Sequence, residues 1–155
     1  MKRRLISRMT LGFLFLLFLA ACSPATKTII VTTEGGKCTL DEGSRISAGE
    51  VTVQWNVNDK TPLIHGLWVL TLDRDHGYKD LVDYVNVDFI EDFPPPWSQY
   101  QGDIFPAKPD SQNEKIFNFD TGPLYLVCLS GDSSINTKEH PVKVIGILGP
   151  IKVVK

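Results

Sequence analysis

Three cysteines, Cys22, Cys38 and Cys128, are the side chains of this chain with the most specific chemistry. Cys22 ends an N-terminal segment in which four basic residues within the first eight are followed by the apolar run 11–19 (LGFLFLLFL) and two alanines. The apolar run is shorter than an ordinary membrane span, and the order basic, apolar, small is that of a cleaved export signal. The segment therefore predicts export from the cytoplasm.

The tetrapeptide Leu19-Ala20-Ala21-Cys22 resembles the lipobox of bacterial lipoproteins. In that family the signal is cut immediately before the cysteine, whose thiol is lipidated. The resemblance implies that 1–21 is a removed signal peptide and that acyl chains such as palmitate on Cys22 anchor the chain to a membrane of the cell envelope, facing the extracytoplasmic side. A plain secretory signal with an incidental cysteine and an uncleaved anchor are the alternatives.

Setting Cys22 aside leaves two cysteines, Cys38 and Cys128. An even number in an exported protein favours a disulfide between them. Such a bond closes a loop of about ninety residues and is worth about 4–5 kcal/mol in the chain-entropy model. Free or metal-bound thiols are the alternative.

The charge of the chain excludes some classes of partner. Residues 1–21 carry four of the 16 Lys and Arg and none of the 18 Asp and Glu, so the remaining 134 residues have a formal charge of −6. Acidic residues are spread along the chain, which argues against nucleic acid as a partner and against electrostatic adsorption of the protein to an anionic membrane. The lipid, rather than the charge, is expected to hold the protein at the bilayer.

The size of the processed chain fits one domain. Residues 22–36 are polar and Thr-rich and end in Gly-Gly, which predicts a lipidated tether whose segment 29–31 can dock as an edge strand. The folded domain is then expected to span 37–155.

Short apolar segments separated by turns dominate this domain. In 51–57, Val and Trp alternate with Thr, Gln and Asn, which predicts a strand with Trp55 in the core. The segment 63–72, with Trp68, is apolar nearly throughout and is expected to be a strand buried on both faces. Further strands are predicted at 115–120, 124–129, 142–148 and 151–154. Together they favour an antiparallel β-sandwich.

Two segments break this pattern. Residues 80–88 have apolar side chains at helical spacing, which predicts a short helix. Residues 93–111 begin with three prolines and are expected to be a long irregular loop, a kind of segment that often carries function.

The strand pattern resembles that of cupredoxins. Residues 51–59 (VTVQWNVND), followed by Pro62 and His65, are similar to the first ligand strand of that family, and 122–128 (GPLYLVC) and 149–153 (GPIKV) are similar to its last two strands. The resemblance covers roughly residues 45–155 in outline. It implies an all-β fold, an antiparallel Greek-key β-sandwich, with the predicted short helix and long Pro-rich loop added.

Transferred residue by residue, the family's copper ligands become His65, Cys128 and His140. A blue-copper site needs two imidazoles, one thiolate and a weak axial donor. Two residues separate Pro62 from His65, twelve positions separate Cys128 from His140, and Ile147 takes the place of the axial Met. Cys128 also cannot be both a ligand and half of a disulfide. The expectation is therefore a cupredoxin-like scaffold with no metal or other cofactor, in which His65 is a hydrogen-bonded histidine at a strand end. A copper-binding electron carrier or chaperone is the alternative.

Other candidate sites have less support. His76 lies in a polar turn and is expected at the surface, and the Ser-rich stretch 130–134 lacks the Gly-x-Ser-x-Gly pattern of a nucleophile. Asp73 and Asp75 begin like a calcium loop, but no glutamate follows in register. The chain is therefore expected not to be an enzyme.

These observations lead to one functional hypothesis. The chain is expected to be a lipid-anchored, extracytoplasmic binding or envelope-accessory module whose protein or small-molecule partner is unknown. Trp97 and Tyr100, in the Pro-rich segment, are the candidate contact residues, and packing of this segment back onto the sandwich is the alternative for Trp97.

Overall fold

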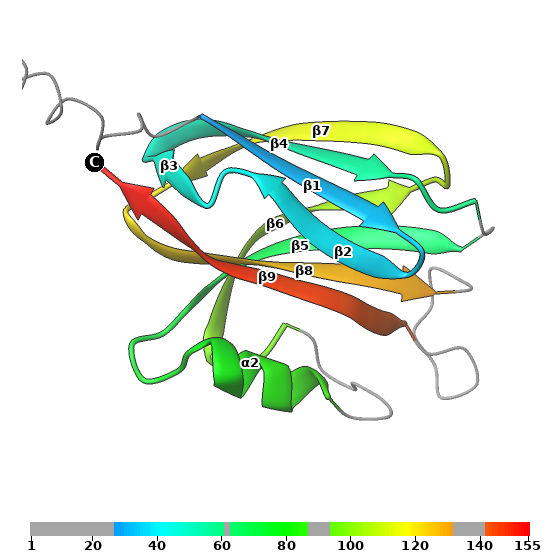
Figure 1. Cartoon of the computed structure of the whole chain (residues 1–155). Coiled ribbons are helices and arrows are strands. Elements are labelled where there is room, and N and C mark those ends of the chain that lie inside the picture. The colour runs from blue at the N-terminus through cyan, green and yellow to red at the C-terminus, as the bar shows by residue number, and fades with distance from the viewer. Residues whose placement is uncertain (1–26, 61–62, 87–93, 132–141) are drawn as a thin grey trace, which may run out of the picture.

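The computed structural model describes residues 27–60, 63–86, 94–131 and 142–155, which form nine strands and one short helix. The strands are arranged in two stacked sheets (Figure 1). One sheet contains, in spatial order, β2 (Lys37–Glu42), β1 (Thr28–Glu34), β4 (Gly49–Val57) and β7 (Ser111–Phe119). The other contains β3 (Arg45–Ser47), β9 (Lys143–Val154), β8 (Gly122–Gly131), β5 (Ile64–Leu72) and β6 (Ser98–Ala107). The predicted β-sandwich is confirmed.

The main core lies between the sheets and follows from period-two alternation. The apolar side chains of β4, including Trp55, are at most 1% exposed, whereas the polar residues between them face outwards. Inward-facing residues of β5 and β8 complete this core from the other sheet. Burial of one face of each sheet is what holds the two layers together.

The folded domain begins earlier than the sequence suggested. Residues 28–34, assigned to a tether over 22–36, form β1, which is hydrogen-bonded to β2 on one side and to β4 on the other. Ile29, Val31 and Thr33 alternate along β1 and are fully buried. Because β1 is paired on both sides, it is an interior strand of its sheet rather than an edge strand.

Both sheets are mixed, although an antiparallel sandwich was expected. β1 pairs with β4 in parallel, and β3 pairs with β9 in parallel, while the other described pairs are antiparallel. The chain passes through β2 and β3 between β1 and β4, which provides the long connection that a parallel pair needs.

β9 is one long strand where two strands were expected. It runs through Gly149-Pro150, and its pairing with β8 shifts register between Leu124 and Leu126. An irregularity of this kind lets a strand bend without ending.

A second, smaller core covers the outer face of the five-stranded sheet. The helix α2 (Tyr78–Val85) lies against that face (Figure 1), and its Leu81 is buried together with Leu70, Tyr125 and Val127. The helix begins two residues before the predicted start and ends at Val85. It is the one helix in the described residues, and no helix there is long and apolar enough to cross a membrane.

The expectation of an irregular loop over 93–111 is wrong for most of its length. β6 occupies 98–107 and pairs with β5, while the prolines at 94–96 precede it. Pro106 lies within β6, which is tolerated because β6 is the edge strand of its sheet. On that edge, Lys115 Nζ from β7 donates a hydrogen bond to the Asp103 carbonyl oxygen (2.8 Å).

Candidate functional site

Cys38 and Cys128 form the predicted disulfide, which confirms their pairing. Their Cα atoms lie 6.3 Å apart, and the bond joins β2 of one sheet to β8 of the other. Cys128 is fully buried. The bond therefore ties the two layers of the sandwich together through the core.

A glycine on β9 makes room for this bond. Gly146 is the register partner of Cys128, and a Cβ atom added at Gly146 would lie 2.7 Å from the Cys38 Cβ. No side chain fits at that distance. Gly146 thus allows β2 to approach β9 closely enough for the two sulfurs to meet.

Next to the disulfide, a short chain of polar groups is satisfied inside the core. The Trp55 indole Nε1 donates to Thr33 Oγ1 at 3.0 Å, and the Thr33 hydroxyl in turn lies 3.7 Å from Cys38 Sγ. The buried indole and hydroxyl therefore do not need a ligand to complete their bonding.

His65, whose ring contacts Trp55, differs from these satisfied polar groups. The residue is fully buried, and neither ring nitrogen has a hydrogen-bond partner among the described residues. Its ring meets Trp55 edge-on, with centroids 6.4 Å apart. Burial lowers the pKa of His65, and the nearby Asp59 carboxylate only partly opposes this. The expected hydrogen bonds of His65 are therefore not made by any described residue, and its burial disfavours the charged imidazolium.

The hydroxyl of Ser130 is also buried and unsatisfied. Ser130 is the register partner of His65 on β8, and its Oγ is buried without a hydrogen bond in the described part of the chain. Asp59, in contrast, accepts hydrogen bonds from the backbone N–H groups of Gly35 (2.6 Å) and Gly36 (3.4 Å). At this end the Asp59 carboxylate is therefore satisfied, whereas the buried His65 and Ser130 side chains are not satisfied by any described residue.

A copper centre would need the Cys128 thiolate beside His65. Cys128 pairs with Leu67, two residues after His65, so His65 and Cys128 occupy neighbouring rows of the inner face. The sulfur of Cys128, however, is bonded to Cys38 and offers no thiolate. His140, together with Cys22, lies outside the described residues, which contain no group of three His, Cys, Asp or Glu able to hold a metal ion. With the disulfide formed, the described residues do not fit copper.

The proposed equivalence of Ile147 with the axial ligand is wrong. Ile147 packs in the outer cluster beneath α2, whereas Cys128 belongs to the inner core. Since alternate residues of a strand face opposite sides of the sheet, Ile147 cannot complete a site around His65 and Cys128.

Trp97 and Tyr100, the candidate contact residues, have different environments. Trp97 is partly buried, with the His76 ring stacked on it at 4.4 Å and Tyr84 of α2 against it edge-on at 5.7 Å. Tyr100 is 46% exposed and touches Trp68, which is only half-buried, at 5.6 Å. Trp97 supports the helix, while Tyr100 faces solvent.

His76 has a structural role that its polar turn did not indicate. Its Nδ1 lies 2.6 Å from Asp73 Oδ1, and this hydrogen bond lowers the pKa of the Asp73 carboxyl. The carboxylate holds the imidazole in the orientation that stacks on Trp97. His76 is therefore a partly covered packing residue rather than a fully exposed one.

Phe105 is an exposed aromatic residue that the sequence reading missed. It lies on β6, is 46% exposed and borders Gly66, where an added Cβ would approach its ring to 3.0 Å. Recognition of 98–107 as an edge strand would have placed Tyr100 and Phe105 together on one outward face.

No protein-family model and no curated protein matches the chain. Two solved structures are similar in fold. One is the dithionite-reduced auracyanin of the photosynthetic bacterium Roseiflexus castenholzii, with 16% identity over 78% of this chain and 98% of that one and a TM-score of 0.48. The other is auracyanin B, with 11% identity over 79% of this chain and 91% of that one and a TM-score of 0.43. Auracyanins are cupredoxins, the family that the sequence resembles.

Proposed function

We propose that the chain is a lipid-anchored, extracytoplasmic binding module on a cupredoxin-like sandwich, which acts through contact with a partner rather than through catalysis. The observation that carries this proposal is the Cys38–Cys128 disulfide. Disulfides persist in oxidising compartments outside the cytoplasm, and this one uses the thiolate that a copper centre would need. The lipobox-like sequence ending in Cys22 supports the anchor.

The outward face of β6 is the contact surface in this proposal. Tyr100 and Phe105 are each 46% exposed there, with the half-buried Trp68 beside Tyr100. Aromatic residues are enriched at protein interfaces because they bury a large area at small entropic cost. Asp103 is the register partner of Trp68, and its carboxylate is already engaged by Tyr100 and by Lys115 (3.8 Å), so the aromatic rings carry the contact and favour a partner with an apolar surface.

The first test is the state of the cysteines in the mature protein purified from membranes. We expect an acylated Cys22 at its N-terminus, no thiol that reacts with an alkylating agent, and an intact mass two hydrogens below that of the dithiol. An unmodified Cys22 would contradict the anchor. Two alkylated thiols would contradict the role of the disulfide.

A second candidate function, copper binding through His65, Cys128 and His140, is favoured by one observation. His65 is buried with two unpaired ring nitrogens in a row next to Cys128. A Cys38→Ser variant frees the Cys128 thiol without reductant. Intense visible absorption on adding copper to this variant, absent when His65→Phe is introduced as well, would support the copper function. Two colourless proteins would end it.

A further inference from the structure

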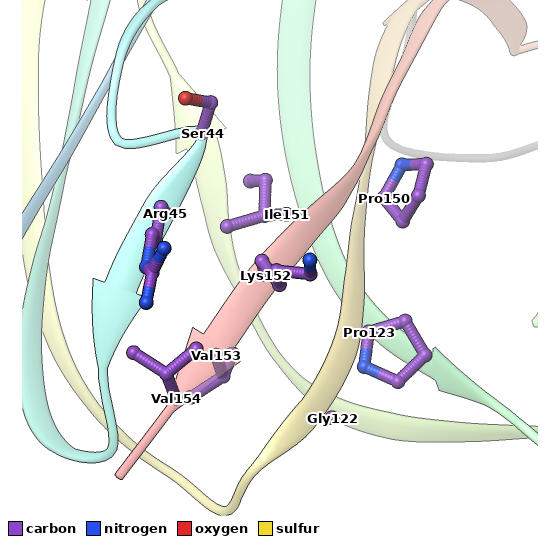
Figure 2. Close-up of a pocket in the computed structure, with 9 residues that line it drawn as sticks. All are labelled: Ser44, Arg45, Gly122, Pro123, Pro150, Ile151, Lys152, Val153 and Val154. Atoms are coloured by element: carbon purple, nitrogen blue, oxygen red, sulfur yellow. The ribbon is translucent and has the colours of Figure 1, made fainter. Parts of the chain in front are cut away.

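A shallow groove lies on the five-stranded sheet, at the end opposite to His65. Its volume is about 640 Å³, and Figure 2 shows the strands β3, β9 and β8 that form it. Two prolines, Pro123 and Pro150, and Val154 provide apolar walls, and Arg45 and Lys152 provide charge. Apolar walls combined with cations suit a ligand that is both anionic and partly apolar.

The two cations are neighbours in the sheet. Arg45 of β3 is the register partner of Lys152 of β9, and both are exposed. Neither forms an ion pair with any described residue. Like charges at directly paired positions destabilise a sheet, and an anion held between them would remove that repulsion. The carboxylates of Glu42 and Glu50 lie on the other sheet.

The groove is also close to the point where the chain enters the domain. The Lys152 N–H donates to the Ser44 carbonyl oxygen (3.0 Å), and an added Cβ at Gly43 would lie 2.7 Å from the carbonyl oxygen of Thr28, the first residue of β1. Cys22 precedes Thr28 by six residues. Six residues span at most about 20 Å when fully extended. A membrane that holds Cys22 therefore lies within a short distance of this end of the sandwich.

We propose that this groove binds the phosphate headgroup of an anionic phospholipid in the membrane to which the chain is anchored. The inference rests on the lipid anchor of the proposed function. Arg45 and Lys152 bind the phosphate, and Pro123, Pro150 and Val154 contact the glycerol and upper acyl region. The formal charge of −6 on residues 22–155 leaves the anchoring to the lipid on Cys22, so the two cations set the orientation of the domain rather than its attachment.

Lysine acetylation followed by mass spectrometry tests the proposal on the mature protein reconstituted into vesicles. Phosphatidylcholine vesicles are compared with vesicles that also contain phosphatidylglycerol. We expect Lys152 to be acetylated about fivefold more slowly in the anionic vesicles. Lys108 and Lys143, exposed near the opposite end, should react equally in both and serve as internal controls. Raising the salt concentration should remove the difference.

The matched variants are Arg45→Gln and, at the opposite end, Lys143→Gln. Arg45→Gln should reduce the protection of Lys152, and Lys143→Gln should leave it unchanged. Equal acetylation of Lys152 in both vesicle types would overturn the headgroup site, as would equal protection in the Arg45→Gln and Lys143→Gln proteins.

Flotation of the vesicles distinguishes a failure of the headgroup site from a failure of the lipid anchor. A lipidated chain floats with phosphatidylcholine vesicles whether or not the groove binds a headgroup. Flotation with both vesicle types but no protection of Lys152 therefore contradicts the groove alone. Flotation with anionic vesicles only would support the groove and contradict the anchor, and no flotation with either would contradict both.

Discussion

Polar side chains lie in opposite environments at the two ends of the sandwich: buried at one end and exposed to solvent at the other. At one end, His65 and Ser130 are buried and their polar side-chain atoms have no partner in the described residues. At the other, Arg45 and Lys152 stand side by side in solvent, next to a groove. An unpaired group costs free energy in the first case because it has lost water, and in the second because it repels its neighbour.

This difference decides what each end can do. A buried imidazole that no described residue satisfies contributes to function only if a ligand or metal reaches it. An exposed cation pair is already accessible and needs only an anion. The Cys38–Cys128 bond strengthens the contrast, because it removes the thiolate that would have made the buried end a metal site.

The largest effect is expected from removing the disulfide at the buried end. Replacing Cys38 and Cys128 together by Ala should lower the free energy of unfolding by about 4–5 kcal/mol, since the bond closes a long loop, with a sequence separation of 90. Urea denaturation of the oxidised parent and the double variant measures this. A loss below about 1 kcal/mol would mean that the bond contributes little to the stability of the sandwich.

A smaller effect of opposite sign is expected from His65→Leu. Removing two buried, unpaired nitrogens while keeping a similar volume should raise the free energy of unfolding by about 1–2 kcal/mol. Ser130→Ala is the matched control and should stabilise by less, because it removes one polar atom. If His65→Leu is destabilised, the imidazole contributes more through its contacts than its unpaired nitrogens cost.

The buried histidine should also make stability depend on pH. The pKa of His65 is lowered in the folded protein, so at pH values below its unfolded value of about 6.5 the unfolded chain binds more protons. Above that pH the imidazole is neutral in both the folded and the unfolded state. Its contribution to the free energy of unfolding therefore no longer changes with pH. It falls on acidification by up to about 1.4 kcal/mol per pH unit, until the folded pKa is reached.

Denaturation curves recorded between pH 7.5 and pH 5 test this dependence. The fall should be weaker in His65→Leu than in the parent protein. An identical fall in His65→Leu and the parent would assign it to other groups.

The smallest effect is expected at the groove. Arg45→Gln should raise the free energy of unfolding by about 0.3 kcal/mol, because it relieves the repulsion with Lys152 in a solvent-exposed row. The gain should vanish at high salt, where exposed charges are screened. A clear loss of stability would show that Arg45 has a packing role and would weaken the contrast between the two ends.

Local sequence patterns predicted much of the fold. The alternation in 51–57 placed Trp55 in the core, and the helical spacing after residue 80 located a helix that the structure places at Tyr78–Val85. The number of cysteines left after Cys22 predicted the disulfide. Each of these inferences depends on residues close together in the chain or on a simple count.

The wrong predictions share a different cause. The segment 93–111 was interpreted from its prolines as a loop, yet 98–107 is a strand because an edge position tolerates proline. The sequence predicts a tether over 22–36 in which 29–31 can dock at a sheet edge, yet 28–34 form a strand between two others. In both cases the sheet neighbours, which are remote in sequence, decided the outcome.

The sequence by itself determined the type of core, the period of most strands and the pairing of two cysteines, because these follow from side-chain alternation and composition. Only the tertiary structure decided that no described residue satisfies His65, that Gly146 makes room for the disulfide, and that Arg45 and Lys152 share one row. These features depend on which strands are neighbours and in what register. That choice is made by long-range packing, and no local pattern of residues records it.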